Sequence, residues 1–171
     1  MKTGVVVFII SYVLLSMIID DVSSGKKYVS NLSTVCIRCL CHSSTQCNMT
    51  VGCQKGYCGP LFLTKEYWRD AGRPTLRDDD PDRTNAFNDC AKDYGCSSTA
   101  VENYMAKFGY DCNNDGVTDC DDYARLHFHG REKCATPISN LYFGKRYESC
   151  KPVPSFPNGK QLFYRIGFIY D

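Results

Sequence analysis

The stretch CIRCLCHSSTQC, residues 36–47, decides what kind of fold this chain adopts, because it places four cysteines within twelve residues. The whole chain has 12 cysteines among 171 residues, and six of them lie between Cys36 and Cys58. Cysteines at this density either bind zinc or form disulfides, and an oxidising compartment favours disulfides. The compartment to which the chain is directed therefore determines how these cysteines are used.

The N-terminus has the layout of a secretory signal peptide. Met1 and Lys2 precede an apolar run from Val5 to Ile19, which Asp20 ends. A positive start, a short apolar run and small residues after it are typical of such a signal. The run is shorter than the ~20 apolar residues of a membrane span, which disfavours the alternative of a signal anchor. We predict that residues 1–24 are removed and that the mature protein is extracellular, without a membrane span.

Secretion predicts that all the cysteines form disulfides. Their pairing stays open, because twelve cysteines allow roughly 10⁴ combinations. The residues expected in bridges are Cys36, Cys39, Cys41, Cys47, Cys53, Cys58, Cys90, Cys96, Cys112, Cys120, Cys134 and Cys150. Two acceptor sequons, which begin at Asn31 and Asn48, predict N-glycosylation at exposed positions.

Length and charge limit the domain organisation and the partners. The chain after residue 24 is long enough for one core and too short for two ordinary domains. We therefore predict a domain over residues 25–150 and a C-terminal extension over residues 151–171. A formal net charge of +1 disfavours nucleic acid as a partner. The extension is apolar from Leu162 to Tyr170, so we expect it either to dock on the domain or to bind a protein partner.

Helix signals begin only after the cysteine-dense segment. Residues 25–63 show little helical periodicity, which predicts loops and short strands held by crosslinks. Residues 64–109 predict a helix capped by Thr64 and a second short helix. The second helix is expected to carry Ala86, Phe87, Cys90 and Ala91.

Two more helices are predicted nearer the C-terminus. The capping box Thr99-x-x-Glu102 opens one, which ends at Gly109 in a left-handed conformation. This helix is expected to bury Val101, Tyr104 and Met105. The other is expected from Thr136 to Cys150, with Ile138, Leu141 and Tyr142 facing inward.

The segment between these helices fits a calcium-binding loop. Asp111-x-Asn113-x-Asp115-Gly116-x-x-Asp119-x-x-Asp122 places oxygen ligands at the required spacing, with a glycine at the sharp turn. The predicted Ca²⁺ ligands are Asp111, Asn113, Asp115, Val117, Asp119 and Asp122. The last of these is an aspartate where glutamate is usual. The alternative is therefore an acidic turn that caps a helix starting near Asp122 and running to Gly130.

A series of motifs in this order resembles the invertebrate-type, destabilase-like lysozymes. The motifs are Cys36-x-x-Cys39-x-Cys41-x5-Cys47, Cys58-Gly59-Pro60, Tyr67-Trp68-Arg69-Asp70, Gly72-Arg73-Pro74, Cys90-x5-Cys96, Val101-x-Asn103-Tyr104-Met105 and Asp122-Tyr123-Ala124-Arg125-x-His127. The resemblance covers about residues 30–150. It implies a small, disulfide-rich, mostly helical α+β lysozyme-like domain with a groove for peptidoglycan and no cofactor for catalysis. Two further family cysteines are Ala71 and Ala100 here, as loss of one bridge would produce.

The same resemblance places the catalytic acids at positions where this chain has none. Glycoside hydrolysis of the lysozyme type needs a general acid and a second carboxylate. The resemblance implies the acid at Ser44, two residues from His42, and the second carboxylate in the loop Gln54–Tyr57, which has no acidic residue. One hypothesis is therefore a secreted protein that binds peptidoglycan or another N-acetylated glycan, or a protein partner, with muramidase activity lost or very weak. The other is an active lysozyme that uses Glu66 and Asp70 as displaced acids.

Overall fold

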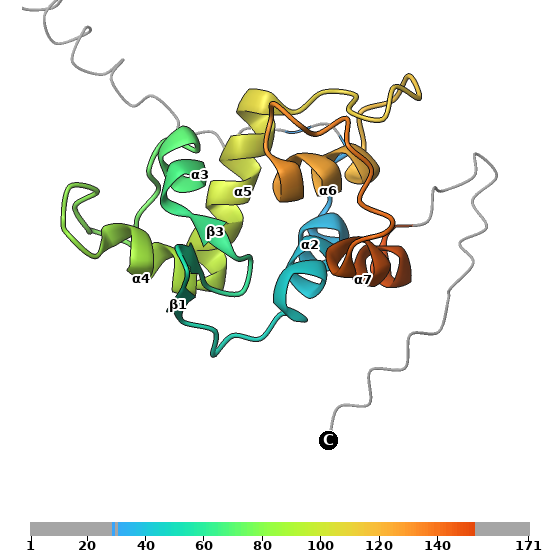
Figure 1. Ribbon diagram of the computed structural model, residues 1–171. Helices are drawn as coiled ribbons and strands as arrows, with labels where there is room; N and C mark the ends of the chain where they lie inside the picture. The colour runs from blue at the N-terminus through green and yellow to red at the C-terminus, as the bar shows by residue number, and fades with distance from the viewer. Residues whose placement is uncertain (1–28, 30, 153–171) are drawn as a thin grey trace, which may run out of the picture.

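The computed structural model describes residue 29 and residues 31–152 of the chain. The predicted signal peptide, and all of the predicted extension except Lys151 and Pro152, lie outside the described residues. Six disulfides, six helices and a small sheet make up the described part (Figure 1). The predicted fold class, α+β, disulfide-rich and mostly helical, is confirmed.

Helix α2 (Thr34–Thr45) lies in a segment that we predicted to be loops and short strands, so this prediction was wrong for residues 34–45. The side chain of Ser33 caps the helix by accepting a hydrogen bond from the Cys36 backbone nitrogen at 3.1 Å. The helix buries a stripe at helical spacing that consists largely of cysteines, namely Cys36, Ile37, Cys39, Leu40 and Cys41. Because disulfides tie this stripe to other helices, tertiary structure stabilises a helix whose local signals are weak.

The short strands that follow α2 are as predicted. Strands β1 (Cys53–Gln54), β2 (Tyr57–Cys58) and β3 (Leu63–Thr64) form an antiparallel sheet in the order β1-β2-β3. Lys55 and Gly56 connect the first two strands with φ angles of 51° and 86°. Positive φ at both central residues is typical of a two-residue hairpin turn.

Helices α3 and α4 also match their predictions. Helix α3 (Lys65–Asp70) begins after Thr64, whose hydroxyl accepts a hydrogen bond from the Tyr67 backbone nitrogen at 3.1 Å. Helix α4 (Ala86–Lys92) buries all of the residues expected on its inner face, namely Ala86, Phe87, Cys90 and Ala91.

Helix α5 (Tyr94–Phe108) begins five residues before Thr99. The prediction that a capping box at Thr99 opens this helix was therefore wrong. Asp93 is the N-cap, because its carboxylate accepts a hydrogen bond from the Cys96 backbone nitrogen at 2.7 Å. Thr99 lies inside the helix and donates its hydroxyl proton to the Gly95 carbonyl. The predicted inner face is confirmed, with Val101, Tyr104 and Met105 all buried.

Gly109 ends α5 as predicted but not in the left-handed conformation, since its φ is −65°. The position needs glycine for a different reason, because neighbouring atoms leave no room for a side chain. A Cβ atom there would lie 2.5 Å from the Met105 carbonyl oxygen and 3.0 Å from the Tyr123 ring.

Helix α7 (Tyr142–Cys150) is shorter than the predicted helix over residues 136–150. Residues 136–141 are instead outside the helix, with a turn at residues 139–140. The helix packs on this segment at Gly144, where a Cβ atom would lie 1.8 Å from the Ile138 carbonyl oxygen. Ile138 is buried as predicted. Tyr142 is 80% exposed, so the prediction that it faces inward was wrong.

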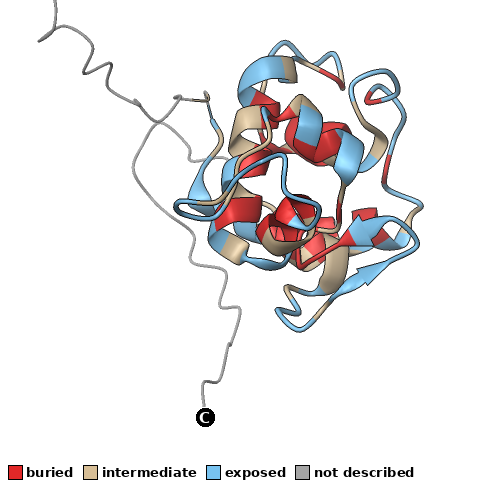
Figure 2. Cartoon of the chain, turned by 90° about the vertical axis from the view of Figure 1, so that its left-hand side faces the viewer, coloured by how far each residue is buried: buried red, intermediate tan, exposed pale blue. Residues whose placement is uncertain are grey.

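The helices form two groups that meet across the core (Figure 1). One group contains the sheet with α3, α4 and α5, and the other contains α2, α7 and α6 (Cys120–His129). Buried residues gather on the faces where these elements meet (Figure 2). Ala71 and Ala100 are both buried, and α3 packs on α5. That the two alanines stand where a bridge was lost stays a prediction. Within the described residues, no helix is long and apolar enough to cross a membrane.

Candidate functional site

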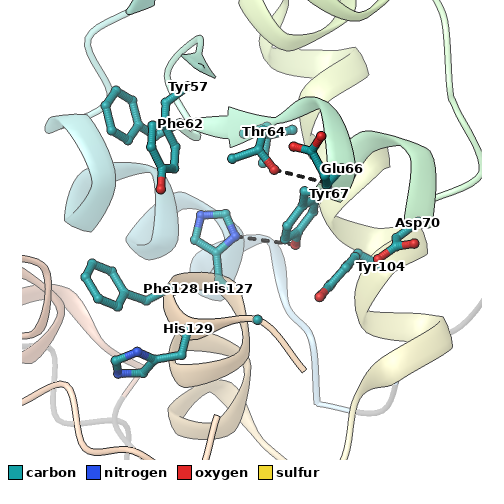
Figure 3. Close-up of a pocket in the computed structure, with 12 residues that line it drawn as sticks. Tyr57, Phe62, Thr64, Glu66, Tyr67, Asp70, Tyr104, His127, Phe128 and His129 are labelled. Carbon is teal, nitrogen blue, oxygen red and sulfur yellow. Dashed lines mark hydrogen bonds between the residues drawn. The ribbon is translucent and has the colours of Figure 1, made fainter. Parts of the chain in front are cut away.

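A pocket of about 260 Å³ lies where the two groups of helices meet (Figure 3). Its walls come from the β2–β3 hairpin, α3 and α5 on one side and from the end of α6 on the other. The residues that line it are Tyr57, Phe62, Leu63, Thr64, Glu66, Tyr67, Asp70, Tyr104, His127, Phe128, His129 and Gly130. The cavity is slightly smaller than common small-ligand sites, and its walls combine aromatic rings with carboxylates and imidazoles.

Aromatic rings form much of the pocket wall. Tyr57 and Phe62 stack with their ring centroids 4.8 Å apart, and Tyr67 stacks on Tyr104 at 3.8 Å. Tyr57 and Phe128 are both nearly half exposed, at 43% and 45%. Exposed rings at the edge of a pocket offer flat apolar faces to a ligand.

His127 lines the pocket and also contacts Ser44 at the end of α2. Its Nε2 atom lies 3.1 Å from the Leu61 carbonyl oxygen and 3.3 Å from the Ser44 hydroxyl oxygen. A carbonyl only accepts hydrogen bonds, so Nε2 carries the proton when it bonds to Leu61. The other ring nitrogen, Nδ1, then accepts from the Tyr67 hydroxyl at 3.4 Å. Burial lowers the pKa of His127 from 6.5 to about 4, and the Leu61 carbonyl opposes that shift only in part. The imidazole is therefore neutral at pH 7.

Ser44, at the position where the resemblance places the general acid, lies against groups that are neutral or positive. Its hydroxyl contacts His127, and its carbonyl accepts a hydrogen bond from the Arg146 guanidinium at 3.4 Å. Because the His127 Nε2 proton is committed to Leu61, this nitrogen has no lone pair with which to activate the Ser44 hydroxyl as a nucleophile. His42, two residues earlier on α2, is not among the residues that line the pocket.

Glu66 and Asp70, the predicted alternative acids, both line the pocket from one side of α3 (Figure 3). Residues four apart lie on the same helix face, which explains this placement. The Glu66 side chain is 72% exposed and pairs with Arg69 at 3.0 Å. The backbone carbonyl of Asp70, rather than its carboxylate, accepts a hydrogen bond from the Lys107 ammonium.

The acidic loop before α6 uses its side chains to bind backbone amides. The Asp122 carboxylate is fully buried and accepts hydrogen bonds from the backbone nitrogens of Cys112 at 2.8 Å, Asn113 at 3.0 Å and Asp119 at 2.9 Å. Asp119 in turn caps α6, so the helix begins at Cys120 and the two aspartates form a capping box. This arrangement matches the predicted alternative, an acidic turn that caps the next helix.

The remaining predicted calcium ligands follow the same pattern. Asp111 accepts from the backbone nitrogens of Asp115 and Gly116, and Asp115 accepts from that of Val117 and from the Asn113 side chain. Among the described residues, no group of three or more His, Cys, Asp or Glu side chains is arranged to hold a metal ion. Calcium binding by this loop stays a prediction, and this geometry lends it no support.

We expect Asp122→Ala to lower the free energy of unfolding by about 3–5 kcal/mol, since three backbone amides lose the buried carboxylate that accepts their hydrogen bonds. Asp122→Asn should cost less, because an amide oxygen still accepts. Urea denaturation measures both, with Asp115→Ala in the exposed part of the loop as the control, expected to cost under about 1 kcal/mol. Equal losses for Asp115→Ala and Asp122→Ala in calcium, but not in EDTA, would contradict this expectation and favour a calcium site.

All twelve predicted cysteines form disulfides, and the structure supplies the pairing. The bridges are Cys36–Cys120, Cys39–Cys150, Cys41–Cys47, Cys53–Cys58, Cys90–Cys96 and Cys112–Cys134.

The two predicted glycosylation sites, Asn31 and Asn48, are both exposed. The Asn31 side-chain nitrogen donates to the Thr118 carbonyl at 2.9 Å, whereas Asn48 uses only its side-chain oxygen, toward Thr50. Glycosylation of either residue stays a prediction, with Asn48 the better placed acceptor.

The fold and the pocket define a small, disulfide-rich protein of the lysozyme-like class. The Destabilase family model matches residues 33–150, and the chain belongs to this family. A lysozyme of Magallana gigas is 29% identical over 123 residues, which cover 70% of this chain and 81% of the relative. Invertebrate-type lysozyme 3 of Caenorhabditis elegans is 32% identical over 111 residues, covering 62% and 78%. The crystal structure of Tapes japonica lysozyme has a TM-score of 0.54 at 26% identity, covering 71% of this chain and 95% of that chain.

Sequence reasoning missed several residues that form the pocket. His127 was noted only as part of a family motif, and Phe62, Phe128 and His129 were not singled out. Phe128 follows His127 near the end of α6, and the available sequence signal was an aromatic residue between two histidines in an expected helix. The contact between Ser44 and His127 joins residues 83 positions apart, which local patterns do not reveal.

Proposed function

We propose that this protein is a secreted lysozyme-like protein that binds bacterial wall glycan in the pocket and has lost muramidase activity. One observation carries the proposal: Ser44, at the expected general-acid position, contacts neutral His127 and cationic Arg146. Lysozyme-type hydrolysis needs no cofactor, but it does need a carboxylic acid to protonate the glycosidic oxygen. No group in contact with Ser44 has that chemistry.

The second acid is missing as well. The turn between β1 and β2, residues 54–57, contains glutamine, lysine, glycine and tyrosine. Binding, by contrast, depends on the pocket walls, and these carry stacked aromatic rings at the edge. An aromatic pocket wall without acids at the expected catalytic positions supports a binding role. The six disulfides support secretion, because such bridges persist in oxidising compartments.

A second candidate function is hydrolysis by displaced acids. The observation in its favour is that Glu66 and Asp70 both line the pocket. A general acid with a raised pKa normally lies in an apolar environment that excludes water. Glu66 is 72% exposed and paired with Arg69, so the binding role fits the geometry better.

Sedimentation with insoluble peptidoglycan tests the proposed binding. We expect the wild-type protein in the pellet and roughly fivefold to tenfold weaker binding for Tyr57→Ala, because an aromatic contact contributes about 1 kcal/mol. Tyr142→Ala is the matched control, since Tyr142 is 80% exposed and does not line the pocket. Failure of the wild-type protein to bind, or equal weakening by both substitutions, would contradict a glycan site in this pocket.

A further inference from the structure

The charged side chains that line the pocket are all acidic. Among the twelve lining residues, Glu66 and Asp70 are the acidic ones, and none is lysine or arginine. The two histidines do not offset this charge fully, because His127 is neutral at pH 7. A cavity with a low-dielectric wall and charges of one sign favours a ligand group of the opposite sign.

Three cations lie near the pocket but outside its lining. Arg131 interacts with Tyr104, and its guanidinium lies over the Phe108 ring at 4.7 Å. Arg69 pairs with Glu66, but both side chains are more than half exposed, and such a surface pair contributes little. The Lys107 ammonium donates to the Asp70 backbone carbonyl and lies over the Phe108 ring at 4.9 Å. Both pocket carboxylates therefore have oxygens with which to accept hydrogen bonds from a ligand.

The aromatic walls favour the same kind of ligand. The face of a phenyl or phenol ring carries partial negative charge, so it attracts cations as well as apolar surfaces. Five aromatic rings line the cavity together with the two carboxylates, from Tyr57, Phe62, Tyr67, Tyr104 and Phe128. Figure 3 shows the Tyr57–Phe62 pair on one side of the opening and Glu66 and Asp70 on the other. A bound group could therefore stack on the rings while its cationic part reaches the carboxylates.

We infer that the pocket selects glycan whose amino sugars have lost their N-acetyl groups and carry free ammonium groups. The inference rests on the proposed glycan binding and specifies the class of glycan. An N-acetylated hexosamine offers a neutral amide at this position, whereas the de-N-acetylated sugar offers three charged N–H donors. Glu66 and Asp70 accept hydrogen bonds from the ammonium group, and the aromatic rings contact the sugar face.

Titration calorimetry at pH 6 and low ionic strength compares a tetramer of glucosamine with a tetramer of N-acetylglucosamine. We expect the glucosamine tetramer to bind about tenfold more tightly, since cation–π contacts and charge-assisted hydrogen bonds together contribute about 1–2 kcal/mol. The double substitution Glu66→Gln with Asp70→Asn should abolish the preference, so that the two tetramers bind with equal affinity. Asp78→Asn, an exposed acidic residue outside the pocket, is the control and should leave the preference unchanged. Tyr57→Ala should weaken binding of both tetramers.

The outcomes separate this inference from the proposed function. Equal or tighter binding of the acetylated tetramer would overturn the inference and leave the proposed function standing. A preference that survives the double substitution would also overturn it, because the selecting charges would lie elsewhere. Binding of a tetralysine peptide as tight as that of the glucosamine tetramer would mean that the pocket takes a cationic peptide, and would overturn the inference as well. If neither tetramer binds and the protein does not sediment with peptidoglycan, the proposed function itself fails.

Discussion

Purified mature protein is expected to clear Gram-positive cell walls at least about 100-fold more slowly than an active lysozyme at pH 5–7. General acid catalysis alone contributes roughly 10²–10⁴-fold, and here the second carboxylate is absent too. The structural reason is that Ser44 stands at the expected position of the general acid and that its hydroxyl contacts a neutral imidazole, so no protonated carboxyl group is present there. A turbidity assay beside an active lysozyme at equal concentration measures the difference. Turnover within tenfold of that enzyme would refute the loss of muramidase activity.

Substitutions extend this test. Ser44→Glu alone should not restore lysis, because residues 54–57 still supply no second carboxylate. If the wild-type protein does lyse walls, Glu66→Gln and Asp70→Asn decide whether displaced acids are responsible. Loss of lysis in those two variants, with Asp78→Asn unaffected, would establish the hydrolytic alternative.

The second large effect concerns stability in acid. Burial lowers the pKa of His127 from 6.5 to about 4, so between these values the unfolded chain binds a proton that the folded protein does not. Stability therefore falls as the pH falls from about 6.5 to about 4. The loss at pH 4 is about 3 kcal/mol relative to pH 8. Protonation also breaks the hydrogen bond that Nδ1 accepts from the Tyr67 hydroxyl.

Urea denaturation between pH 8 and pH 4 isolates this contribution. The difference in unfolding free energy between the wild-type protein and His127→Gln should change by about 3 kcal/mol over that range, since glutamine does not titrate. Its side-chain amide still donates to the Leu61 carbonyl, which limits other losses. His42→Gln, which removes a histidine from α2, is the matched control. Parallel pH profiles for the wild-type protein and His127→Gln would contradict this expectation, because they would mean that the pKa of His127 is the same in the folded and unfolded states.

Features that depend on a few neighbouring residues were predictable from the sequence. The cap at Thr64, the buried face of α4 and the presence of all twelve bridge residues follow from local chemistry and compartment. The family was also predictable, because its motifs occur in order along the chain.

Features that depend on distant contacts were not. Helix α2 carries cysteines on its buried face, and their partners lie up to 111 positions away, so its local pattern did not indicate a helix. The start of α7 depends on how closely Gly144 approaches the Ile138 carbonyl, which no local rule gives. The same holds for the pocket. Its walls come from three separate parts of the chain, and the contact of Ser44 with His127 appears only once α2 and α6 pack together.

The bridge between Cys39 and Cys150 has a consequence for resistance to proteolysis. It spans nearly the whole domain, so a single cut of the backbone anywhere between those two residues leaves both fragments covalently joined. A cut in the exposed charged loop around Asp78 leaves a second link as well, through Cys36–Cys120. Both of these links start from α2, so the fragments stay anchored beside the helix that carries Ser44. A nicked molecule therefore keeps its pocket walls tethered to one another, and its binding capacity should outlast the integrity of its backbone.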